Sequence, residues 1–95
     1  MTYRRDLERM TTLSSREIDD ACGGVRIPEL ITHCVDELLE LTELADEALG
    51  DERIDEHVLL VQEVSAWRET AQLLRLMADD ADVRALRLGG ISGAA

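Results

Sequence analysis

Two long stretches of apolar residues at helical spacing constrain the fold of this chain most. The first stretch contains Ile31, Cys34, Leu38, Leu41, Ala45 and Ala48. The second contains Leu60, Val64, Trp67, Ala71, Leu74 and Ala78. Steps of three and four residues place such side chains on one face of a helix. The pattern therefore predicts two long helices, each with an apolar seam that must be covered.

Local signals indicate where these two helices begin and end. Pro28 suits the first turn of a helix, where its missing amide hydrogen is not needed, and Gly50 suits a helix end. We expect Asp51 to cap the second long helix, which we place from about Glu52 to Met77. A connection this short forces the helices to lie side by side and antiparallel.

Shorter helices are predicted before the hairpin. Residues 2–10 have the apolar spacing of a short amphipathic helix. A second short helix is expected to begin at a capping box of Ser14 and Glu17 and to end at Gly23 and Gly24, which permit a left-handed backbone.

After the hairpin, the acidic run 79–82 is expected to break the helix and to cap a short one over residues 83–88, followed by a loose tail at 91–95. The chain then forms a single domain, 1–95. Its parts are short helices in 1–27, the hairpin in 28–78, and a short helix and tail in 79–95.

The composition agrees with an all-α fold. Apolar residues make up 45% of the chain, yet it has no Phe, one Trp and one Tyr, so the core must be aliphatic. One Pro and six Gly leave little material for the turns of an all-β fold.

A two-helix hairpin leaves half of each apolar stripe in water, so something must cover the other side. Either the short N-terminal helices fold back onto it, or a second copy docks to make a four-helix bundle. Leu30, Val35, Leu44 and Leu49 widen the first stripe, and the short helices carry few large apolar groups. We therefore expect a homodimer.

The charge limits the possible partners. The chain has 21 acidic residues and 10 basic ones, all of them Arg, for a net charge of −11. Residues 28–82 hold 16 acids and three Arg, so the whole excess lies there. This charge repels nucleic acids and anionic lipids and leaves basic proteins as possible partners. Adaptation to high salt and a GC-rich coding bias are alternative explanations.

The apolar runs are too short for a signal peptide or a membrane span, the longest being Val58–Val61. Two cysteines, Cys22 and Cys34, do not make a disulfide framework. We therefore expect a cytoplasmic protein.

Few side chains suggest chemistry. His33, Cys34 and His57 are the nitrogen and sulfur candidates on the long helices, and Glu29 and His33 stand one helical turn apart. A closed zinc site needs four ligands at a recognisable spacing, so we expect Cys34 to be a core thiol and both histidines to lie on the surface. No nucleophile has a base beside it in the pattern. We assign no catalytic, cofactor or metal residues.

An acidic stripe lies on the outer face of the first long helix. It consists of Asp36, Glu40, Glu43 and Glu47. A solvated face explains such a stripe, and a binding surface for Arg- or Lys-rich partners or a mimic of nucleic-acid charge is the alternative.

The stretch from Cys34 to Met77 resembles the cysteine-rich four-helix-bundle copper-binding family, whose helices carry Cys at steps of 4, 3, 4 and 3. The corresponding places here are Cys34, Leu38, Leu41, Ala45 and Ala48. The segments 45–52 and 70–74 add to the likeness. The resemblance implies a helical scaffold.

Together these features predict a non-enzymatic, dimeric helical protein that serves as an interaction or regulatory module. The alternatives are a bundle that binds copper or zinc through Cys34, His33 and His57 across a dimer axis, and an acidic mimic that blocks a basic nucleic-acid-binding protein.

Overall fold

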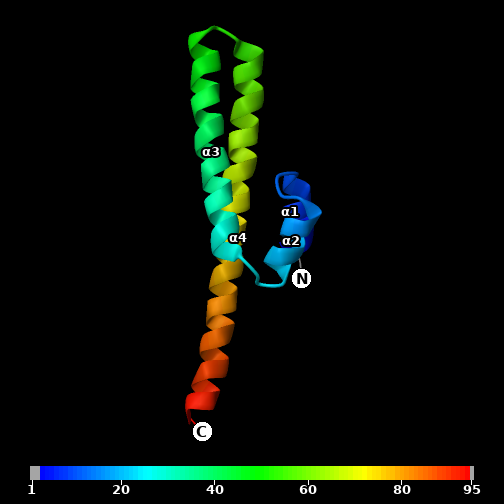
Figure 1. Ribbon diagram of the computed structural model, residues 1–95, viewed down its shortest axis with the longest axis vertical. Coiled ribbons are helices and arrows are strands. Elements are labelled where there is room, and N and C mark those ends of the chain that lie inside the picture. The colour runs from blue at the N-terminus through cyan, green and yellow to red at the C-terminus, as the bar shows by residue number, and fades with distance from the viewer. Residues whose placement is uncertain (1–2, 95) are drawn as a thin grey trace.

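Helices account for the fold in the computed structural model, which describes residues 3–94, with side chains as far as Asp82. They are α1 (Tyr3–Met10), α2 (Ser15–Cys22), α3 (Ile27–Gly50) and α4 (Ile54–Ala94). The helices α3 and α4 run antiparallel to each other, and α1 and α2 lie beside them (Figure 1). No strand occurs in the described chain. The predicted all-α helix hairpin is confirmed.

The start and end of α2 follow from local hydrogen bonds. Ser14 Oγ accepts a hydrogen bond from the Glu17 amide at 3.2 Å, and Glu17 Oε1 accepts one from the Ser14 amide at 2.8 Å. This is the predicted capping box, which satisfies two amides that have no partner inside the helix. Gly24 has a φ of +74°, the left-handed conformation expected after the helix end.

The turn between the long helices is tight. The helix α3 ends at Gly50 as predicted, and the Asp51 amide donates to the Glu47 carbonyl at 3.0 Å. Asp51 therefore closes α3, and the expectation that it caps the next helix was wrong. Glu52 then takes a left-handed backbone with a φ of 62°, and α4 begins at Ile54.

The helix α4 is longer than predicted. Its backbone stays helical through the acidic run 79–82 and on to Ala94, so the break expected there is absent. Tyr3 Oη donates a hydrogen bond to the Asp80 carboxylate, which ties α1 to this part of α4. The expectation of a separate helix at 83–88 and a loose tail from residue 91 was wrong, because α4 is continuous as far as Ala94. The side chains from residue 83 on, and the whole of residue 95, lie outside the described residues.

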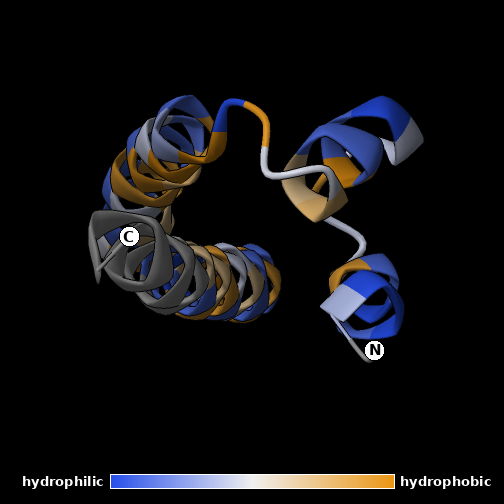
Figure 2. Cartoon of the chain, turned by 90° about the horizontal axis from the view of Figure 1, so that it is seen from below, coloured by the Kyte–Doolittle hydropathy of each residue, from blue (hydrophilic) through white to orange (hydrophobic). Residues whose placement is uncertain are grey.

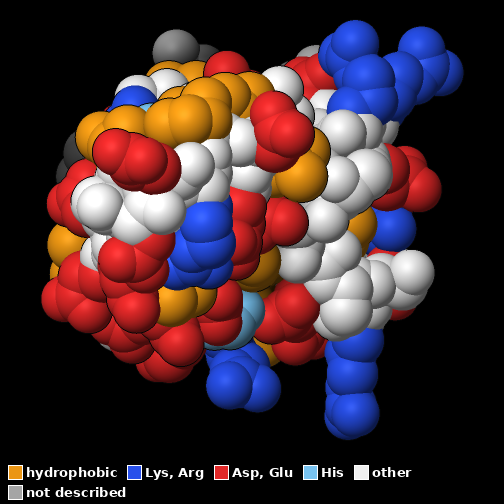
Figure 3. Space-filling view, turned by 90° about the horizontal axis from the view of Figure 1, so that it is seen from above, with side chains coloured by type: hydrophobic (Ala, Val, Ile, Leu, Met, Phe, Trp, Pro, Cys, Tyr) orange, Lys and Arg blue, Asp and Glu red, His pale blue; other side chains and the backbone are white. Residues whose placement is uncertain are grey.

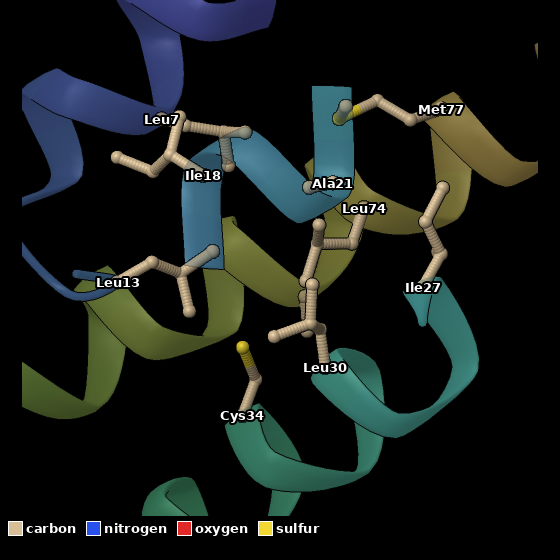
Figure 4. Close-up of a cluster of buried hydrophobic side chains, with 10 residues drawn as sticks. Leu7, Leu13, Ile18, Ala21, Ile27, Leu30, Cys34, Leu74 and Met77 are labelled. Carbon is tan, nitrogen blue, oxygen red and sulfur yellow. The ribbon is translucent and has the colours of Figure 1, made fainter. Parts of the chain in front are cut away.

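The main core lies where the short helices meet the hairpin (Figure 4). Its buried members are Leu7, Leu13, Ile18, Ala21, Ile27, Leu30, Cys34, Ala71, Leu74 and Met77. Thr70 is also buried, and its hydroxyl lies 2.7 Å from that of Thr12 and donates to the Ala66 carbonyl at 2.8 Å. The polar group is satisfied, so its burial carries no large penalty.

The short helices thus fold back onto one end of the hairpin, one of the two arrangements that the sequence left open. Seen along the hairpin, they stand to one side of it with hydrophilic outer faces (Figure 2). We call residues 36–63, which form the other end of the hairpin and its turn, the distal half. The short helices leave this half uncovered (Figure 1).

The molecule is elongated. Its extents are 65 × 20 × 16 Å and its radius of gyration is 17.0 Å, whereas a compact chain of this length has a radius of about 12 Å. A rod of two helices has little interior, so the buried residues are concentrated at the level where the short helices pack against the hairpin.

Candidate interaction surface

The seam residues lie between α3 and α4 as predicted. Cys34, Ala45 and Ala48 are buried on α3, and Val64, Ala71 and Leu74 are buried on α4. The residues that widen the first stripe behave differently. Leu30 is buried, but Leu44 and Leu49 are 43% and 50% exposed. The distal half of the hairpin therefore covers only the centre of its apolar stripe.

Trp67 lies at the edge of the main core. It is half-buried and packed against the core cluster. Its ring meets His33 edge-on, with 5.4 Å between the ring centres and an angle of 89° between the planes. This T-shaped arrangement suits the charge distribution of aromatic rings. Trp67 therefore joins α4 to α3 near Cys34.

The three metal candidates do not come together within one chain. His33 Nε2 lies 3.8 Å from Glu17 Oε2, while His57 Nδ1 lies 2.7 Å from the Ala45 carbonyl oxygen. Ala45 is twelve residues beyond His33, which is about 18 Å along the helix. Among residues with described side chains, no group of three or more His, Cys, Asp or Glu could hold a metal ion.

The Cys34 thiol is buried, and this burial raises its pKa to about 11, with the nearby carboxylates of Glu17 and Glu37 adding to the shift. At neutral pH the group is therefore a neutral thiol, and the thiolate that would bind a metal or attack a substrate is disfavoured. Cys22, in contrast, is exposed.

The acidic stripe lies on the surface of the distal half. Its members Asp36, Glu40, Glu43 and Glu47 are all exposed. In the described part of the chain none of them forms an ion pair. Arg53 at the turn pairs with Asp51 and Glu56. Looking onto this end of the hairpin, Figure 3 shows crowded carboxylates with apolar side chains beside them.

Large apolar side chains are exposed on the same half. They are Leu39, Leu44, Leu49, Ile54, Val58, Leu59 and Val61. The sequence analysis did not single them out as a surface, although it recognised that the stripe was wider than one hairpin can cover. That excess width was the signal that could have located them.

None of the helices, as far as the side chains are described, combines the length and apolarity needed to cross a membrane. The structure thus offers an elongated hairpin with an uncovered end that is both acidic and apolar.

The sequence model of the TY-Chap C-terminal domain family, Chap-C, matches residues 1–81. No curated protein and no solved structure matches the chain significantly. The match spans both short helices, α3 and most of the described part of α4.

This match corrects the resemblance to the cysteine-rich copper-binding family, which was wrong. That resemblance rested on steps of three and four residues, which any pair of packed helices shows, and only Cys34 of its five places carries sulfur. Because the family match covers most of its length, the chain belongs to the TY-Chap C-terminal domain family.

Proposed function

We propose that this chain is a non-enzymatic, chaperone-type module that binds a partner protein through the distal half of its hairpin. The name of its family supports a chaperone-type role. The observation that carries the proposal is the concentration of large exposed apolar side chains on the half that the short helices leave bare. Contiguous exposed apolar surface on a small domain is typical of a protein-binding site.

The two halves of the hairpin suit different tasks. The half beside the short helices, which we call the proximal half, holds the main core and is fixed by α1 and α2, with the Thr12–Thr70 bond and an Arg4–Asp19 ion pair of 2.8 Å. The distal half buries Ala45 and Ala48 but no large side chain of its own. A well-packed half of the hairpin thus holds an exposed distal half in place, which is how we expect a binding module to be built.

Two earlier expectations accompany this proposal. The homodimer stays a prediction that competes with this proposal: since the short helices already cover one end, a second copy would have to dock on the distal half in place of a partner protein. The cytoplasmic location also stays a prediction.

Crosslinking in living cells of the host tests the proposed function. A photo-crosslinking residue replaces Val58, which is 48% exposed in the distal half, and the same residue at Arg5 in α1 is the control. We expect a defined partner to be captured at position 58 and not at position 5. A chaperone-type role further predicts that this partner loses solubility when the chain is deleted. A captured partner that stays soluble, or no partner at all, contradicts the proposal.

A further inference from the structure

Five exposed apolar side chains in the distal half form one surface, which we call the distal strip. It consists of Leu39, Leu49, Ile54, Val58 and Val61, with exposures of 58%, 50%, 53%, 48% and 43%. Residues 54, 58 and 61 follow one another at steps of four and three and so share one side of α4. Each side chain has roughly half its surface available to a partner.

The distal strip faces away from the short helices. The side they occupy is marked by Glu17, which approaches His33 of α3, and His33 in turn meets Trp67 of α4. Val58 precedes Trp67 by nine residues, or about two and a half turns, which places it on the opposite side of α4. Leu49 follows His33 by sixteen residues, nearly four and a half turns, with the same result for α3. The α3 and α4 parts of the strip therefore share one face.

The distal strip has no cover within the described chain. Ala45 and Ala48 are the buried residues between the helices at this level, and His57 Nδ1 reaches the Ala45 carbonyl at 2.7 Å. Small seam residues allow the helices to approach closely, so the larger side chains on either side of the seam are left outside it. The result is a shallow apolar surface along both helices.

The charge around this surface selects the occupant. Residues 36–63 contain eleven acids and one Arg, a net charge of −10, and Arg53 is already paired with Asp51 and Glu56. A second copy docked at the same end would place two such charges against each other, which costs free energy. Nucleic acid and anionic lipid are repelled for the same reason. An occupant that is both apolar and basic is attracted.

The length of the distal strip sets the size of that occupant. Leu39 and Leu49 are ten residues apart, which is about 15 Å along α3, or nearly three helical turns. A helix laid beside two parallel helix axes buries residues at steps of three and four and keeps its charged residues at the rim.

We propose that the distal strip docks an amphipathic helix of a partner protein, about three turns long, whose apolar stripe is flanked by Arg or Lys. This inference rests on the proposed function and adds the position of the site and the chemistry of the partner. The apolar side chains hold the helix, and the carboxylates of Glu43 and Asp46, which form no ion pair within the described chain, attract its basic flanks.

Binding of a model helix to the full chain tests the inference. The probe is a labelled peptide of Leu and Lys arranged as an amphipathic helix, and the control probe has Glu in place of Lys; fluorescence anisotropy reports binding. We expect the Lys peptide to bind and the Glu peptide not to. The double variant Leu39→Ser, Val58→Ser should weaken binding about tenfold or more. Leu76→Ser, at an equally exposed leucine of α4 outside the strip (57%), should leave it unchanged.

A second pair of variants separates charge from apolar contact. Glu43→Gln with Asp46→Asn should lower affinity and weaken its salt dependence, whereas Glu69→Gln, an exposed acid outside the distal half, should change neither. If the Lys peptide binds the Leu39→Ser, Val58→Ser variant as tightly as the Leu76→Ser variant, the inference is overturned. Binding of the Glu peptide also overturns it.

The remaining outcomes identify other occupants. In sedimentation of the chain alone, a dimer that dissociates in the Leu39→Ser, Val58→Ser variant assigns the distal strip to a second copy. This result overturns the partner-helix proposal. A partner captured in cells that binds the serine double variant as well as the wild type leaves the chaperone-type function standing and removes the strip as its site. Circular dichroism melts of each variant confirm that a loss of binding is not a loss of fold.

Discussion

Two leucines of α4 provide a sharp test of where the stability of this chain resides. Leu74 is fully buried in the core formed by the short helices and the hairpin, whereas Leu76, two residues on, is 57% exposed. Because both positions lie in the same helix, replacing either with Ala changes helix propensity by the same small amount. The difference between the two variants therefore reports burial alone.

The size of the effect follows from the structure. Truncating a buried leucine to Ala costs about 3 kcal/mol, since the surrounding side chains close the cavity only partly. A domain of this size has a total stability of roughly 5–14 kcal/mol, so Leu74→Ala should lower the melting temperature by about 15 °C. Leu76→Ala should stay within about 0.5 kcal/mol of the wild type.

Thermal melts followed by circular dichroism, with urea titrations for the free energies, measure both variants under the same salt conditions. If the two substitutions lower stability equally, or if Leu76→Ala is the more harmful, then the short helices do not cover α4 as described. A loss of cooperativity in Leu74→Ala alone is consistent with release of α1 and α2 from the hairpin.

Three further predictions follow. Trp67→Ala should lower the free energy of unfolding by about 3 kcal/mol, because the half-buried ring packs on the core. The fluorescence emission maximum of the wild type should lie at a shorter wavelength than that of tryptophan in water. An unchanged melting temperature together with the emission maximum of tryptophan in water contradicts this. Burial holds the pKa of Cys34 at about 11, above its ordinary value in the unfolded chain, so the free energy of unfolding should fall as pH rises from about 9 to 11. Cys34→Ala should abolish that decline. An identical decline in both proteins refutes the assignment. Added NaCl should raise the melting temperature by screening the repulsion in residues 36–63, less so in Glu43→Gln, Glu47→Gln; a melting temperature that falls with salt argues against this account.

The hairpin was predictable because its signals are local. Pro28 and Gly50 bound one helix by the geometry of their own backbones, and Ser14 and Glu17 close a capping box three residues apart. None of these depends on the rest of the fold. The steps of three and four residues likewise define a helix face wherever they occur.

The features that escaped prediction depend on contacts between distant residues. The acidic run at 79–82 looked like a break, but α1 approaches it, and the Tyr3 hydroxyl donates to Asp80 across 77 positions of sequence. Whether the short helices or a second copy cover the hairpin also depends on such contacts, among them the Thr12–Thr70 bond. A heptad-like pattern indicates that an apolar seam must be covered, but it does not identify the element that covers it.

The same limit explains the candidate site. Leu44 and Leu49 were assigned to the widened first stripe from their spacing, and both proved exposed because the buried seam residues at this end are Ala45 and Ala48. The family could not be identified from helical spacing either, since packed helices of unrelated proteins share it.

The rod-like form of the molecule has a consequence for experiments in solution. A particle measuring 65 × 20 × 16 Å tumbles and diffuses more slowly than a sphere of the same mass, so a monomer of 10.6 kDa should elute from a sizing column ahead of globular standards of its own weight. Early elution is therefore expected of one chain. Only a method that weighs the particle, such as multi-angle light scattering or native mass spectrometry, distinguishes a pair of chains from a single extended one.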